Sequence, residues 1–114
     1  MIKNLGARKL RRTSSHRQAM LRNMATSLIL HERVQTSTAK AKELRSFAEK
    51  VITQAKRGDH RAVRRVIHNR TAFSKLFDVL AKRYGERMGG YTQILHVGTR
   101  RGDNSPQSLI RLAS

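Results

Sequence analysis

The sequence predicts an α+β fold in which a small three-stranded mixed sheet packs against several helices, preceded by a basic extended N-terminal arm. Apolar residues recur at helical spacing in several segments before residue 85, and short β-branched segments lie at one internal position and near the C-terminus. The resulting order is helix, strand, helices, strand, strand, which is typical of an α+β domain. A length of 114 residues suits one domain. We therefore expect an arm over residues 1–13 and a single globular domain over residues 14–114.

The arm shows neither helical nor strand periodicity. Residues 1–13 carry five positive charges and no acid. A segment of this kind buries too little apolar surface to offset the entropy cost of ordering. We expect it to be a disordered tail in the isolated protein and to become ordered only against nucleic acid.

A helix and a short strand are predicted next. Ser15 and Gln18 have the spacing of a capping box, whose side chains satisfy backbone amides of a first helical turn. We predict a helix over about 15–31 and a strand over 33–37, where β-branched residues alternate with others. The apolar face of this helix consists of Met20, Leu21, Met24 and Leu28.

The clearest helix signal follows the strand. Thr38 is expected to cap a helix that ends near Lys56, because Gly58 supplies the usual C-terminal signal. Asp59 is then expected to cap a shorter helical segment. The apolar stripe of the longer helix consists of Ala41, Leu44, Ala48, Val51, Ile52 and Ala55.

The last third of the chain is predicted to add a helix and two strands. Thr71 is expected to begin the helix and Gly85 to end it, with large apolar residues between them at spacings of three and four. Strands are predicted over 91–97 and 108–112. The connection over 98–107 is long for a hairpin and contains two adjacent arginines.

The net charge indicates the class of partner. Lys and Arg total 25 against 7 Asp and Glu, which gives a formal net charge of +18. A small body with this charge repels itself unless a polyanion neutralises it. Of the basic residues 17 are Arg, the side chain that binds phosphate through two hydrogen bonds at once. Nucleic acid is therefore the predicted partner.

The sequence excludes or disfavours several other kinds of protein and of functional site. The absence of Cys excludes disulfide scaffolds, zinc knuckles and thiol nucleophiles. No apolar run approaches the roughly 20 residues of a membrane span. His31 and Glu32 resemble the start of a zinc-protease motif, but Gln35 stands where the second ligand would be. His60 and His68 are expected at the surface. We predict no enzyme activity, metal, cofactor or small-molecule substrate.

Twelve residues are predicted to bind nucleic acid, mainly through phosphate and shape. Arg64 and Arg65 fit a solvated helix face equally well. With two Tyr and no Trp, stacking on unpaired bases is expected to be a minor contribution. The predicted residues lie in the arm, at the start of the first helix, in the segment after Asp59 and in the long connection: Lys3, Arg8, Lys9, Arg11, Arg12, His16, Arg17, Arg22, Arg64, Arg65, Arg100 and Arg101.

Nearly the whole chain resembles the bacterial-type large-subunit ribosomal protein seventeen family. The resemblance consists of short motifs in the same order and at similar spacings. Three points depart from the family pattern. The chain begins Met1-Ile2-Lys3-Asn4 where the family usually begins Met-Arg-His, Gln93 stands where Arg is common, and Arg111 stands where an acid is common. The matching motifs are Ser15–Met20, Arg22–Met24, His31–Glu32, Lys40–Arg45, Lys75–Phe77, Gly89–Thr92 and Arg101–Asn104.

This resemblance implies a structural constituent of the large ribosomal subunit that binds large-subunit ribosomal RNA and supports subunit assembly and translation. It implies neighbouring large-subunit proteins as further partners, and no catalytic residue. The implied location is the ribosome in the bacterial cytoplasm, with an organellar ribosome as the alternative. A DNA-binding or nucleoid-architectural protein is the first alternative compatible with the charge. A cationic membrane-surface protein is the second, although the apolar residues are better explained as core.

Overall fold

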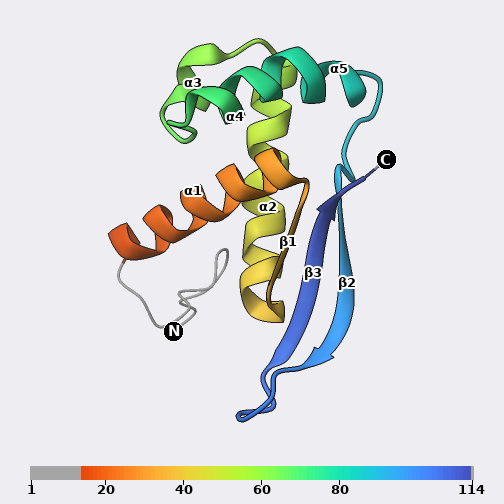
Figure 1. Ribbon diagram of the computed structural model, residues 1–114. Helices are drawn as coiled ribbons and strands as arrows, with labels where there is room; N and C mark the ends of the chain where they lie inside the picture. Colours follow the sequence, from red (N-terminus) through yellow and green to blue (C-terminus); the bar gives the residue numbers. More distant parts are fainter. Residues whose placement is uncertain (1–13, 114) are drawn as a thin grey trace, which may run out of the picture.

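Helices and strands follow one another in the expected order (Figure 1). The computed structural model describes residues 14–113, so the arm predicted over 1–13 lies outside the described residues. The α+β class is confirmed. The elements are α1 (Ser14–His31), β1 (Arg33–Ser37), α2 (Thr38–Lys56), α3 (His60–Arg64), α4 (Arg70–Lys75), the π-helical turn η1 (Leu76–Leu80), α5 (Ala81–Arg83), β2 (Thr92–Thr99) and β3 (Pro106–Leu112).

The sheet is antiparallel throughout, so the prediction of a mixed sheet is wrong. Its strand order is β1-β3-β2, and β3 runs antiparallel to both of its neighbours. The first and second strands therefore point in the same direction, but they never pair because the last strand lies between them. Strand order depends on contacts far apart in the chain, which the local patterns of single strands do not encode.

Helix α2 is the central element of the core. Its entire predicted stripe is buried, and Figure 1 shows it crossing behind α1 and beside the sheet. Gly58 follows the helix with φ of +76°, a conformation that glycine adopts without steric cost. Large side chains from the other elements complete the core, among them Leu28, Ile67, Leu76 and Ile110, each no more than 1% exposed.

Three predicted helix starts differ from the structure. Ser37, not Thr38, caps α2, with its hydroxyl accepting a hydrogen bond from the Lys40 amide. The Thr38 hydroxyl lies instead 2.7 Å from that of Ser108 on β3. Asn69, not Thr71, caps α4. The third difference concerns α1, which begins at Ser14. Ser15 therefore lies in the first turn of the helix and does not precede it.

The two tyrosines connect the C-terminal strands to the helices. Tyr84 and Tyr91 are 1% and 2% exposed, and their rings lie 5.2 Å apart. The Tyr84 hydroxyl donates to the Ala113 carbonyl, and the Ala113 amide donates to the Tyr91 carbonyl at 2.8 Å. The end of β3 is thereby held against the end of the helical layer.

Candidate nucleic-acid interface

Most of the acidic side chains are engaged in contacts within the fold. Asp59 accepts a hydrogen bond from the Ala62 amide at the start of α3. Glu49 accepts one from the Thr92 hydroxyl at 2.8 Å. Glu32 and Asp103 form ion pairs described below. These four residues are most of the seven acids in the chain, which stand against 25 Lys and Arg, so a large excess of positive charge remains.

The first half of α1 presents one group of predicted contacts. Its first turns lie largely exposed, with His16 fully at the surface and Arg17 and Arg22 partly covered. No acidic side chain lies in the first turn of this helix. Figure 1 shows this end of α1 projecting away from the sheet and α2. The five predicted contacts of the arm, Lys3, Arg8, Lys9, Arg11 and Arg12, lie outside the described residues.

The tip of the β2–β3 hairpin presents a second group. Arg100 and Asp103 form an ion pair at 2.5 Å, and the Arg100 amide donates to the Ser105 carbonyl at 2.7 Å. The Arg100 hydrogen bond, followed by that of the Ser105 amide, lowers the pKa of Asp103 to about 2. Arg101 is exposed beside this closed turn. The turn therefore fixes Arg100 while Arg101 extends toward solvent.

Helix α3 presents a third group at the other end of the molecule. Arg64 and Arg65 are exposed, and the Arg64 guanidinium lies 5.1 Å from the centre of the Phe73 ring. Figure 1 shows α3 at the top and the hairpin tip at the bottom. The described members of the predicted set therefore form three separate surfaces, not one patch.

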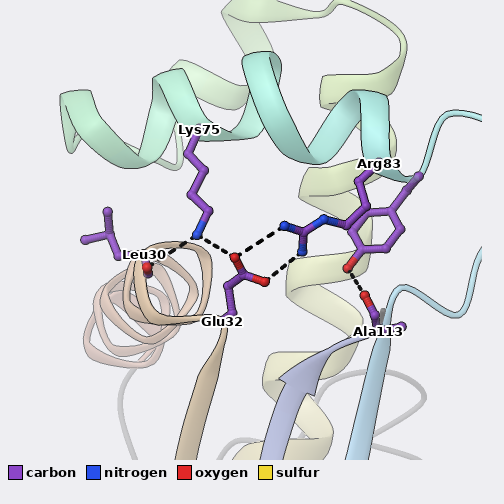
Figure 2. A network of polar contacts seen from close by, with 6 residues as sticks. Leu30, Glu32, Lys75, Arg83 and Ala113 are labelled. Carbon is purple, nitrogen blue, oxygen red and sulfur yellow. Dashed lines mark hydrogen bonds and ion pairs between the residues drawn. The ribbon is translucent and has the colours of Figure 1, made fainter.

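A partly exposed network of ion pairs, which the sequence does not predict, fixes the helical layer to the start of the sheet. Lys75 donates to Glu32 at 2.9 Å, and the Arg83 guanidinium donates to both oxygens of the same carboxylate at 2.7 and 3.4 Å. Figure 2 shows the two cations converging on Glu32 from the helical run above it. The hydrogen bond from Arg83, then that from Lys75, lowers the pKa of Glu32 to about 2.

Glu32 itself occupies an unusual backbone position, with φ of +64° between α1 and β1. A non-glycine residue rarely adopts this conformation. Its partners lie 43 and 51 residues away in the sequence, so no local spacing could indicate them. The one local hint in the sequence is that Glu32 is the first acid of a strongly basic chain, which makes it a natural partner for cations. Glu32 thus joins the helical run to the start of the sheet through its contacts with Lys75 and Arg83.

We expect Glu32→Gln to destabilise the fold at neutral pH. The side chain is 39% exposed, and solvent therefore screens its ion pairs. The expected loss in the free energy of unfolding is about 1 to 2 kcal/mol. Because folding lowers this pKa from 4.5 to about 2, its stabilisation is complete above pH 4.5 and is lost as the pH falls through about 2.

Urea unfolding at pH 7 and near pH 2 tests this expectation, with Glu86→Gln as the control at an exposed glutamate. The difference between wild type and Glu32→Gln should shrink toward the lower pH. An equal loss at both pH values would show that the carboxylate charge is not what stabilises the junction.

Residues 14–113 contain no group of three His, Asp or Glu side chains placed to hold a metal ion. None of the helices within the described range is long and apolar enough to cross a membrane. Gln93 and Arg111, which both depart from the family pattern, are cross-strand partners, and the Arg111 side chain donates to the Gln93 amide oxygen at 3.0 Å.

Comparison with known proteins identifies the family. The family described as Ribosomal protein L17 matches residues 20–113. The large ribosomal subunit protein bL17 of Elusimicrobium minutum is 52% identical over 112 residues, covering 98% of each chain. That of Endomicrobium trichonymphae is 49% identical over 117 residues and covers all of both chains. That of Geobacter sulfurreducens is 55% identical over 115 residues, covering 98% of this chain and 66% of that protein.

The matched region extends over most of α1 and over all of the later helices and strands. The motifs quoted from the sequence lie within the matched region or directly before it, which confirms the resemblance on which they were based. The chain therefore belongs to the ribosomal protein L17 family, whose members are structural proteins of the large ribosomal subunit and not enzymes.

Proposed function

We propose that this chain binds large-subunit ribosomal RNA through phosphate and shape contacts, and that this binding supports subunit assembly and translation. In this proposal the arm of residues 1–13 and the folded body of residues 14–114 act together. The arm neutralises phosphates while α1, the hairpin tip and α3 dock against RNA. Neighbouring large-subunit proteins are the second class of partner that we propose.

The distribution of charge carries this proposal. Five of the 25 basic residues lie in the arm, so twenty belong to the body, against seven acids. Several of those acids are engaged within the fold, whereas Arg64, Arg65 and Arg101 are exposed. Multivalent phosphate contacts are the interaction that such a surface makes most strongly.

The salt dependence of RNA binding tests the proposal. If eight basic side chains contact phosphates, the logarithm of the association constant should fall with the logarithm of the salt concentration with a slope of roughly −6 to −7. The binding constant should be measured on a large-subunit RNA fragment and on duplex DNA at matched salt concentrations.

The DNA measurement distinguishes this function from that of a nucleoid protein. We expect the RNA to bind more tightly than the DNA, because the proposed contacts recognise the shape of a folded RNA. A slope near zero on RNA would contradict the phosphate contacts. Equal or tighter binding of duplex DNA would contradict the ribosomal RNA assignment.

A further inference from the structure

Helix α3 and the helical run after it face each other through two pairs of side chains. His60 and Arg64 lie four residues apart on α3, and Phe73 and Phe77 lie four residues apart on α4 and η1, so each pair shares one helix face. The His60 ring is stacked on Phe77 with centres 4.0 Å apart and an angle of 7°. The Phe73 and Phe77 rings lie 4.9 Å apart.

The His60 ring is held in one orientation although the residue is exposed. Its Nδ1 lies 2.9 Å from the Gly58 carbonyl oxygen. A carbonyl can only accept, so Nδ1 carries the proton and Nε2 faces away from this bond. Together with the stacking on Phe77, this hydrogen bond fixes the ring at the surface. The Phe73 ring lies 6.0 Å from the His60 ring and 4.9 Å from the Phe77 ring, so this cluster restrains Phe73.

A hollow of about 310 Å³ lies beside Phe73. It is lined by Arg64, Ile67, His68, Arg70 and Phe73. Ile67 is 1% exposed and forms an apolar base, while Arg64 lies over the Phe73 ring. The lining combines an aromatic ring, an apolar floor and two guanidinium groups, and it includes no acid.

This combination matches the chemistry of one nucleotide. A base stacks on aromatic rings and on guanidinium planes, and a phosphate binds to arginine. A base paired within a duplex exposes only its edges, so it could not place its face against Phe73. An unpaired base could do so. The strong positive charge of the whole chain favours RNA over a protein segment as the occupant.

We propose that the hollow between α3 and α4 binds a single unpaired nucleotide of ribosomal RNA, with its base against Phe73 and Arg64 and its phosphate at Arg70. This inference rests on the proposed function, and it gives that function a stacking contact in addition to its phosphate contacts. It also assigns Arg64 and its neighbours a role beyond a solvated helix face.

A pair of RNA stems tests the site in the full-length protein. One stem carries a single bulged nucleotide and the other is fully paired, with binding measured at the same salt concentration. Stacking of a base contributes about 1 to 3 kcal/mol, so the wild type should prefer the bulged stem by about 5- to 140-fold. Phe73→Leu should reduce this preference toward unity, because leucine retains apolar volume but removes the ring.

Matched variants separate stacking from folding and from charge. Phe47→Leu changes another half-buried phenylalanine that packs against the core but does not line this hollow. Arg64→Gln and Arg57→Gln each remove one positive charge, and only the former lies at the hollow. We expect the preference to fall in Phe73→Leu and Arg64→Gln and to persist in Phe47→Leu and Arg57→Gln. Since Arg64 is exposed, its variant remains informative if Phe73→Leu fails to fold.

Ultraviolet cross-linking of the bulged stem locates the nucleotide on the chain. Trypsin cleaves after Arg70 and Lys75 and after Arg45 and Lys50, which releases two five-residue peptides with one phenylalanine each. A nucleotide adduct is expected on residues 71–75 and not on 46–50.

The outcomes distinguish the two proposals. If the wild type binds both stems equally, or if Phe73→Leu and Arg64→Gln keep the preference, the nucleotide site is wrong while RNA binding stands. An adduct on the 46–50 peptide in place of 71–75 would also overturn the site. If the protein binds neither stem, the proposed function itself fails.

Discussion

Replacing Leu44 with Ala is expected to lower the free energy of unfolding by about 2 to 5 kcal/mol. Leu44 is fully buried on α2, the helix that contacts both α1 and the sheet. The shorter side chain leaves a cavity among residues from several elements, which cannot all move to fill it. For a body of this size such a loss is a large share of the total stability. Urea unfolding followed by circular dichroism measures it.

Lys42→Ala is the control for this substitution because Lys42 lies exposed on the same helix. Alanine favours helix as well as lysine does, so we expect a change within about 0.5 kcal/mol. Leu44→Met should cost less than about 1.5 kcal/mol because it nearly conserves volume. A similar small change in all three variants would contradict the assignment of α2 as the centre of the core.

Replacing the five cations of the arm with Gln is expected to weaken RNA binding strongly without affecting the fold. If each one contacts a phosphate, the slope of binding against salt should become shallower by about 3.5 to 4.5. The hydrophobic core cluster runs from Leu21 to Ala113, so the free energy of unfolding should not change. The substituted residues are Lys3, Arg8, Lys9, Arg11 and Arg12.

A second variant controls for net charge. It replaces five exposed cations of the body that are not predicted contacts: Lys42, Lys50, Arg57, Lys82 and Arg111. Both variants lose the same charge, so a nonspecific effect of charge would lower the slope equally in both. The arm is a binding element if its variant loses clearly more. An unchanged slope in the arm variant would show that these residues do not contact RNA.

Local signals in the sequence were sufficient for much of the fold. The apolar stripe of α2, the glycine after it and the Asp59 cap depend on neighbouring residues, and all three are confirmed. By contrast, Ser37 and Thr38 are both good caps by residue type. Ser108, 70 residues from Thr38, contacts its hydroxyl, and Ser37 caps the helix. Choices of this kind depend on tertiary contacts that a local pattern cannot contain.

In the candidate nucleic-acid interface, too, local signals predict part of the arrangement and tertiary contacts determine the rest. Charge alone indicated the class of partner and the basic segments, but it could not show that α3 and the hairpin tip lie at opposite ends of the molecule. His60 and His68 were predicted at the surface, and both are exposed. The stacking of His60 on Phe77 was not predicted, because it joins residues on different helices. The convergence of Lys75 and Arg83 on Glu32 was likewise beyond any local pattern.

We propose that this chain functions in the large ribosomal subunit while bound to its RNA. The decisive experiment is sedimentation of the tagged chain from a cell lysate through a high-salt sucrose gradient. We expect the chain to travel with the large subunit and to move to the top of the gradient after the RNA is digested. A chain that stays at the top without digestion, or that follows chromosomal DNA, would contradict the claim.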